Sequence, residues 1–280
     1  MSAIDVRSLA SRHPHASASK MADILDLAVN GGGQSAPSAD DVASALDSLF
    51  GPQQQQAGNE AESLFWTLWT LYIDVARRVP AVDDDRQKLL VSAVEALKSR
   101  KRGSVRVWSN DSAVWGDLPM LGPCMREAWN STPNLNGSEA DKAAMDACIN
   151  VNSFAARLLG SSVTTWDNLA VWSLRDTLET ELTVSNGDGV DASISVACEW
   201  LHHAGKALHD KGSGASAANL DDATRRVLRP GSLFDGESGL NDKRWRFWRN
   251  RLAALAGKAT DVEVKTRAQS VVQLMDMLGA

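Results

Sequence analysis

The sequence predicts an all-α protein, built as an irregular multi-helix bundle or an array of helical pairs with about nine to ten helices. Apolar residues recur three and four positions apart over most of the chain, which is the spacing of helices that bury one face. Residues 105–109 (VRVWS) are the only stretch with β-like residues, and they are too few to found a sheet. Because neither a strand–helix–strand pattern nor a fixed repeat period is visible, parallel α/β folds and regular solenoids are disfavoured.

The N-terminal fifth of the chain differs in composition from the rest. Residues 31–39 and 51–58 are poor in large apolar side chains, as are residues 212–219 further along. Such segments bury too little surface to offset the entropy of ordering them, so we expect loops or insertions there. A short helix is predicted between the first two. We therefore predict a flexible N-terminal extension with short helices over residues 1–58 and a single helical domain over residues 59–280.

The strongest helical pattern lies at the start of this predicted domain. Residues 60–79 carry apolar side chains almost all round the helix, which is typical of a central, buried helix, and residues 83–101 form an amphipathic partner. Residues 114–130 contain two prolines and two glycines, which predicts an irregular turn and then a helix entered near Pro123. Further helices are predicted at about 139–160, 165–182, 190–210, 219–228, 239–257 and 260–278.

Charge and cysteine content restrict the class of protein. The formal net charge is -6, which disfavours nonspecific binding to nucleic acid or to anionic membranes. No apolar run reaches the roughly 18–20 residues of a membrane-spanning helix, and no apolar leader segment is visible at the start. Cys124, Cys148 and Cys198 are widely spaced and odd in number, which favours reduced, buried thiols. We therefore expect a cytoplasmic protein; a mitochondrial presequence is the alternative for its Ser- and Ala-rich start.

Ten tryptophans against one tyrosine is an unusual ratio. Most of the tryptophans fall on apolar stripes of predicted helices, where a large side chain is expected in the core; these are Trp66, Trp69, Trp172, Trp200, Trp245 and Trp248. Trp115 and Trp129 flank the Gly/Pro turn instead, and helical periodicity explains them least. They are our candidates, together with Arg126, for an aromatic ligand-binding pocket.

The turn between these two tryptophans also carries the candidate catalytic residues Asp117, Arg126 and Glu127. A rigid turn that leads into a helix can present backbone N–H groups to an anion, with Arg126 and Glu127 positioned to orient or protonate a substrate. The alternative, which we favour, is a structural corner in which Asp117 and Arg126 fix the loop through hydrogen bonds.

Other groups of polar residues have a structural explanation that we favour. Asp176 and Glu179 share one helix face, as paired carboxylates must for acid/base work, but most surface helices offer such a pair, so we predict a solvated face. His202 and His203 are adjacent on a helix and point about 100° apart, so they are poorly placed to chelate one metal. The usual metal, nucleotide and hydrolase motifs are absent, so we expect no metal and no cofactor.

The basic run at residues 243–251 (KRWRFWRNR) allows two interpretations. Arginines interleaved with aromatic residues can form a surface for phosphate, nucleic acid or anionic lipid. We favour a core helix that turns Trp245 and Trp248 inward, with arginines that are solvated or pair with the excess acids. Nucleic acid is therefore not an expected partner.

Several long strings resemble a fungal family known as domain of unknown function 3632. They are VWGDLPMLGPCMREAWN (114–130), FAARLLG (154–160), WDNLAVWSLRDTLE (166–179) and RPGSLFDGESGLNDKRWRFWRNRL (229–252). The similarity extends from about residue 60 to residue 257. It implies an ascomycete, intracellular, helical protein, and it implies no activity or catalytic residues.

These observations favour a binding or interaction protein without catalysis, because no catalytic motif is present. The alternative is a cofactor-independent small-molecule enzyme of fungal metabolism, of the isomerase or cyclase type. Its aromatic pocket near residues 115–129 would use one acid and one cation to fold and protonate an apolar substrate. A third reading is binding of nucleic acid or phospholipid through residues 243–251. The partner and the oligomeric state are left open.

Overall fold

The computed structural model describes residues 3–32, 36–51, 58–131, 142–182, 187–213 and 220–279. These residues belong to two compact units, Met1–Thr132 (unit 1) and Pro133–Ala280 (unit 2). The predicted all-α class is confirmed, because the described residues contain thirteen helices and one two-stranded sheet. The number of helices exceeds the predicted nine to ten. One reason is that the predicted helix 190–210 is two helices that are separated at Ala204.

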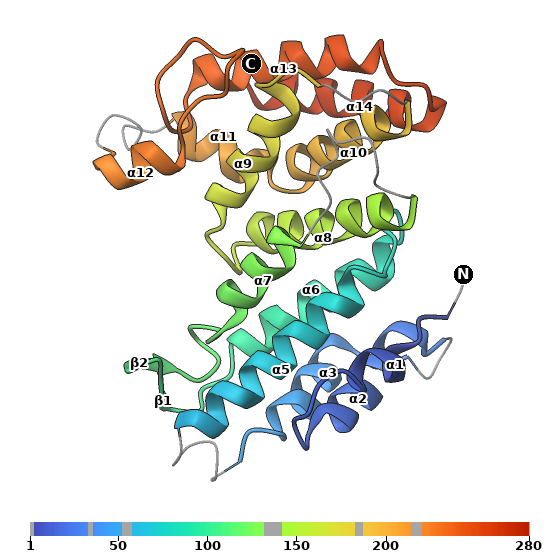
Figure 1. Cartoon of the computed structure of the whole chain (residues 1–280), viewed down its shortest axis with the longest axis vertical. Helices are drawn as coiled ribbons and strands as arrows, with labels where there is room; N and C mark the ends of the chain where they lie inside the picture. The colour runs from blue at the N-terminus through green and yellow to red at the C-terminus, as the bar shows by residue number, and fades with distance from the viewer. Residues whose placement is uncertain are drawn as a thin grey trace. The chain divides into compact units, whose positions relative to one another are not determined.

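Unit 1 is built around one buried helix (Figure 1). Its elements are α1 (Val6–Ala10), α2 (Ala18–Asn30), α3 (Ala39–Asp47), α5 (Gly58–Ala76), α6 (Asp84–Lys98), β1 (Ser104–Val107), β2 (Asn110–Ala113) and α7 (Leu121–Asn130). Helix α5 contacts α1, α2, α7 and β1. The predicted central helix is thus confirmed, since Leu64, Phe65 and Trp69 are each fully buried. The all-round apolar pattern has one exception, because Trp66 is 37% exposed.

The N-terminal helices bury apolar side chains of their own. Val6 and Leu9 of α1 and Met21 and Leu25 of α2 are at most 1% exposed. Both helices contact α5, and α3 packs against α6. Residues on both sides of the predicted 58/59 boundary therefore belong to unit 1, and the extent of a domain over residues 59–280 stays a prediction.

The strands β1 and β2 form an antiparallel hairpin beside α5 (Figure 1). Residues 105–109 were expected to be too few for a sheet. They do form one, because they pair with a second short strand, Asn110–Ala113, that contains no β-branched or aromatic residue. Propensity could not reveal this strand. A contact from outside the strand also stabilises the hairpin, because Asp117 Oδ2 accepts a hydrogen bond from the Ala113 N–H (2.6 Å).

Unit 2 is also arranged around one buried helix. Its helices are α8 (Lys142–Gly160), α9 (Asp167–Leu178), α10 (Gly187–His203), α11 (Gly205–Ser213), α12 (Asp222–Val227), α13 (Asp242–Ala256) and α14 (Val262–Leu278). Helix α10 contacts α8, α9, α11, α13 and α14. Its Trp200 is fully buried and donates its indole N–H to Asn152 Oδ1 on α8 (2.7 Å). A Cβ at Gly160 would lie 2.0 Å from the His203 carbonyl oxygen, so only glycine allows α8 and α10 to approach this closely.

A buried ion pair fixes the long segment between α12 and α13. Arg244 Nε and Nη2 donate to the two carboxylate oxygens of Glu179 (2.6 and 2.9 Å), and both side chains are fully buried. The same carboxylate accepts hydrogen bonds from the Gly231 N–H (2.8 Å) and the Trp248 indole (2.6 Å). Arg244 Nη1 donates to the carbonyl oxygens of Leu228 and Gly239. Every charge in this pair is therefore hydrogen-bonded, which a buried ion pair requires.

The prediction of a solvated face for Glu179 is wrong. Asp176 is exposed, but Glu179 is fully buried. Helix α9 ends at Leu178 and Glu179 is its C-terminal cap residue, so the helical periodicity that placed it on the surface no longer applies there. Its partner Arg244 lies 65 residues later in the chain, beyond the reach of any local pattern.

Replacing Arg244 tests the importance of this pair. We expect Arg244→Met to lower the free energy of unfolding by about 3–5 kcal/mol, because it leaves the Glu179 carboxylate buried without a cation. Arg249→Met is a matched control on the same helix, since Arg249 pairs with Asp276 at the surface (2.7 Å). An exposed pair contributes about 0–1 kcal/mol. Urea denaturation measures both variants, and equal losses would contradict a special role for the buried pair.

Candidate functional site

Trp115, a predicted pocket residue, is part of the core of unit 1. Its side chain is fully buried, and its ring packs edge-on against Phe65 (5.4 Å between centroids) and Phe50 (6.1 Å). The indole N–H donates to Asp47 Oδ1 (2.6 Å). This carboxylate also accepts from Arg102 Nε (2.7 Å). Trp115 therefore joins the hairpin region to α3 through packing and one hydrogen bond.

Asp117, a predicted catalytic residue, fixes the local backbone. Its side chain is exposed, and Oδ2 accepts hydrogen bonds from the Ala113 N–H (2.6 Å) and the Ser112 hydroxyl (3.2 Å). These contacts close the turn that follows β2. They are the loop-fixing interactions that the structural alternative for this corner requires.

The other predicted site residues lie on α7. Arg126 and Glu127 are exposed and Trp129 is half-buried, whereas Trp115 is in the core. The helix is anchored at both ends: the Trp69 indole donates to the Pro119 carbonyl (2.7 Å) and Arg77 Nη2 donates to the Ala128 carbonyl (2.7 Å). The catalytic and ligand-binding roles of these residues stay predictions, as does the alternative enzymatic function.

The thiol nearest to this corner is poorly suited to nucleophilic chemistry. Cys124 on α7 is buried, and this burial raises the pKa of its thiol to about 11. Burial likewise raises the pKa of Cys198 on α10 to about 12. A nucleophilic cysteine needs a lowered pKa, because the thiolate is the reactive form. These two thiols behave as small core residues.

The tip of the hairpin presents an exposed tryptophan in a strained conformation. Trp108 and Ser109 form the two-residue loop, and both have positive φ angles (47° and 66°). This type of turn favours Asn-Gly, since a left-handed conformation costs other L-residues about 1–2 kcal/mol. The Trp108 side chain is nevertheless 55% exposed, so packing in the core does not explain its presence there.

A carboxylate on α5 holds this tip in place. Glu62 Oε1 accepts a hydrogen bond from the Trp108 backbone N–H (2.7 Å). Trp66 lies one helical turn after Glu62, on the same side of α5, and is also exposed. We call Trp66 and Trp108 together the aromatic surface. Trp66 was predicted to lie in the core, and Trp108 was not a candidate, because the hairpin beside α5 was not predicted.

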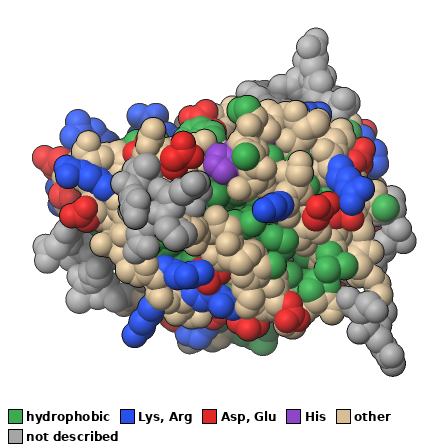
Figure 2. Space-filling view, turned by 90° about the horizontal axis from the view of Figure 1, so that it is seen from below, with side chains coloured by type: hydrophobic (Ala, Val, Ile, Leu, Met, Phe, Trp, Pro, Cys, Tyr) green, Lys and Arg blue, Asp and Glu red, His purple; other side chains and the backbone are tan. Residues whose placement is uncertain are grey.

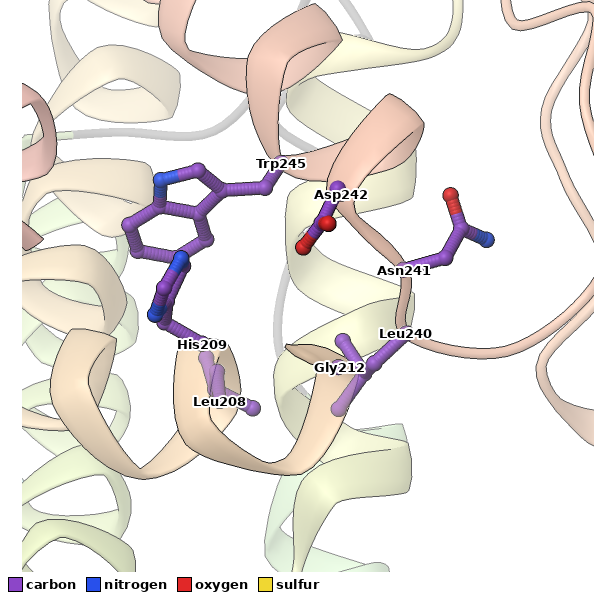
Figure 3. A pocket seen from close by; sticks show the side chains of 7 residues that line it. All are labelled: Leu208, His209, Gly212, Leu240, Asn241, Asp242 and Trp245. Carbon is purple, nitrogen blue, oxygen red and sulfur yellow. The ribbon is translucent and has the colours of Figure 1, made fainter. Parts of the chain in front are cut away.

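A small pocket lies in unit 2 between α11 and α13 (Figure 3). It is lined by Leu208, His209, Gly212, Leu240, Asn241, Asp242 and Trp245. The Asp242 carboxylate points toward the space beside the His209 and Trp245 rings, whose centroids are 5.0 Å apart. The pocket has room for about one water molecule. It is therefore too small for an organic substrate in this conformation.

The polar side chains around this pocket do not form a hydrolase triad. The Ser213 hydroxyl donates to Asp242 Oδ1 (3.2 Å) and lies 3.4 Å from His209 Nε2. In a serine hydrolase the imidazole lies between the hydroxyl and the carboxylate, so that it can accept the hydroxyl proton. Here the hydroxyl lies between the other two groups, and the carboxylate does not orient the imidazole.

The basic run on α13 is largely neutralised by acids. Arg244 pairs with Glu179, Arg249 with Asp276 and Arg251 with Glu181. Trp245 and Trp248 are buried. This is the arrangement expected of a core helix with paired arginines. Among the described residues, no three His, Cys, Asp or Glu side chains are placed to share a metal ion, and no described helix is long and apolar enough to span a membrane.

Comparison with known proteins places the chain in a family. The profile of a family described as "Protein of unknown function (DUF3632)" matches residues 69–252. The chain belongs to the DUF3632 family. The match runs from within α5 to α13 and covers all four strings on which the resemblance was based. No curated protein and no solved structure matches the chain. The family description names no activity.

Relaxing the strained tip tests whether Trp108 is there for stability. We expect Trp108→Asn to raise the free energy of unfolding by up to about 1 kcal/mol, because asparagine tolerates a left-handed conformation better than tryptophan. Ser109→Gly should have a similar effect and keeps the indole. Urea denaturation measures both. A loss of stability in Trp108→Asn that Ser109→Gly does not show would mean that the indole serves the fold.

Proposed function

We propose that the chain is a binding protein that contacts a partner protein through the aromatic surface of unit 1. The observation that carries this proposal is Trp108, an exposed indole at a strained turn that Glu62 holds in place. Backbone strain persists where the surrounding structure enforces it, and such positions concentrate at functional sites. Tryptophan is also among the residues that contribute most to binding at protein interfaces.

The exposed area is large enough to matter for affinity. A tryptophan side chain can bury about 150–250 Å², so covering the exposed half of Trp108 removes about 100 Å² from water. At about 25 cal/mol per Å² this favours association by about 2–3 kcal/mol. Trp66, which is 37% exposed, adds to the same surface. These two residues would form the centre of the interface, and the polar contacts around them would exclude water.

The charges near Trp108 favour a partner protein with an uncharged binding surface. Arg106 and Asp111 lie directly opposite each other in the hairpin, so their charges offset each other. The loop residues Trp108 and Ser109 carry no charge. One face of the molecule, drawn in Figure 2, carries acidic and basic side chains interspersed with hydrophobic ones. A hairpin with offset charges and an exposed indole suits apolar contact with a protein better than contact with a polyanion.

The location of the protein belongs to the same proposal. Cys124, Cys148 and Cys198 are buried and form no disulfide among the described residues, which is usual where the compartment keeps thiols reduced. We therefore also propose a cytoplasmic location, and the resemblance of the sequence supports a fungal origin.

Two variants separate binding from folding in the test of this proposal. Tagged wild-type chain, Trp108→Asn and Ser109→Gly are incubated with the same cell extract, and captured proteins are quantified by mass spectrometry. We expect at least a tenfold loss of the captured partner with Trp108→Asn and no loss with Ser109→Gly, because both relax the turn and only one removes the indole. A partner captured equally by all three proteins would refute a role for the aromatic surface.

A further inference from the structure

The outer strand of the hairpin in unit 1 has an open backbone edge. Strand β1 packs beside α5, and β2 is the other strand of this two-stranded sheet. Three of the four residues of β2 are exposed and the fourth, Ser112, is half-buried. A strand edge that faces solvent is a template on which another chain can add a strand.

The hydrogen-bond pattern shows which groups of β2 point outward. In an antiparallel pair, residues that exchange both backbone hydrogen bonds alternate along the strand with residues that exchange none. The Val114 N–H donates to the Gly103 carbonyl (3.0 Å), which marks Val114 as a residue that bonds to the first strand. Two steps of this alternation place the N–H and carbonyl groups of Asp111 and Ala113 on the side away from β1, at the open edge.

Asp117 occupies the outward groups of Ala113. Its Oδ2 accepts a hydrogen bond from the Ala113 N–H (2.6 Å), and its own N–H donates to the Ala113 carbonyl (3.2 Å). A residue of a third strand would make the same two bonds at this position, with a carbonyl oxygen in place of the carboxylate oxygen. The chain therefore supplies one residue of a third strand itself, and this row of bonds stops before Asp111.

Asp111 is the next position along the same edge. Its side chain and that of Arg106 lie on the exposed face of the hairpin, opposite the face on which Val105 and Val107 are buried. Among the described residues, no group hydrogen-bonds to the outward N–H or carbonyl of Asp111. These two backbone groups are therefore available to an added chain.

The open edge is continuous with the aromatic surface. Asp111 follows the turn residue Trp108 by three positions, so the hairpin tip lies about 7–10 Å along the strand from Asp111. An extended segment that bonds to Asp111 reaches the tip within two or three of its own residues. One of its side chains can then cover the exposed indole while its backbone bonds to the edge.

A second copy of the chain is a poor occupant of this edge. Two β2 strands that pair about their centre place one Asp111 opposite the other, because Asp111 is the outward residue that both strands offer. Like charges directly opposite each other destabilise a strand pair. The formal net charge of -6 adds a general repulsion between copies. The charge of the edge thus favours a different protein, with a segment that has no acidic residue opposite Asp111.

We propose that the partner protein adds an extended segment to the edge of β2 opposite Asp111, as a short third strand. This mode of binding rests on the proposed function of the aromatic surface and specifies its partner: an extended, non-acidic segment with an apolar side chain that covers Trp108. The backbone bonds orient the segment, and the buried indole selects the apolar side chain, as in other cases of strand addition. Asp117 is a positioning residue, because it fixes the edge where the added strand begins.

Peptides of random sequence are the probe that tests this binding mode. A displayed library of peptides of about ten residues, the upper length of ordinary strands, is selected on the full-length chain. Peptides that also bind Trp108→Asn are removed, so that the remaining ones depend on the indole. We expect these to be rich in β-branched and aromatic residues and poor in Asp and Glu, because they bind as strands beside an acidic residue.

Two substitutions at one position separate the backbone of the edge from its charge. Asp111→Pro removes the outward N–H, and an edge strand tolerates proline where no bond to its neighbour is lost. Asp111→Ala is the matched control, since it keeps the N–H and removes only the carboxylate. We expect Asp111→Pro to weaken binding of the selected peptides at least tenfold and Asp111→Ala to change it by less than about threefold.

Hydrogen exchange of the wild-type chain makes the test independent of how the proline variant folds. We expect saturating peptide to slow exchange of the Asp111 amide at least tenfold, because the amide becomes a donor to the added strand. The Ala113 amide is the internal control, since it is already bonded to Asp117 and should change less.

The outcomes separate this binding mode from the proposed function. Peptides that need Trp108 but bind Asp111→Pro as tightly as wild type, and leave the Asp111 amide unprotected, would overturn strand addition and leave binding through the indole intact. Selection of no peptide would overturn strand addition as well. A wild-type dimer that Asp111→Pro dissociates would assign the edge to a second copy and refute a partner segment. Equal capture of a partner by Trp108→Asn would instead refute the proposed function.

Discussion

The buried pair between Glu179 and Arg244 determines how the C-terminal half of unit 2 is arranged. One carboxylate at the end of α9 binds the guanidinium of α13, the Trp248 indole and the Gly231 N–H, and the guanidinium in turn binds two backbone carbonyl groups. The irregular chain between α12 and α13 is thus ordered by two side chains rather than by secondary structure. Removing either charge would leave the other one buried without a partner. Replacing one of the two residues alone would therefore lower the stability of the fold.

Single carboxylates also order other irregular segments of the chain. Asp191 of α10 accepts hydrogen bonds from the Thr260 and Asp261 N–H groups and so fixes the turn between α13 and α14. Asp117 closes the turn after β2, and Glu62 holds the hairpin tip. Carboxylates are strong acceptors for backbone N–H groups. Some of the acidic side chains of the chain therefore order loops, rather than only interacting with solvent.

Patterns within one helix were predictable, and contacts between distant segments were not. The apolar residues around Trp69 predicted the buried helix α5, because periodicity depends only on neighbouring residues. Glu179 and Trp108 were misjudged or overlooked because the partners that define their surroundings, Arg244 and Glu62, lie 65 and 46 residues away. The loop-fixing role favoured for Asp117 could be inferred, since its partner Ala113 is four residues away. Nothing in the sequence distinguished the buried Trp115 from the exposed Trp66.

We propose that the hairpin tip holds the backbone of Trp108 rigidly, so that its exposed indole is presented to a partner. Amide and indole ¹⁵N relaxation of the free protein measures this directly. We expect backbone order parameters at Trp108 close to those of β1, about 0.85, because the Glu62 carboxylate binds its N–H. Values below about 0.6 would show a mobile tip. In that case the strained turn would not be maintained in solution, and the aromatic surface would not be preformed.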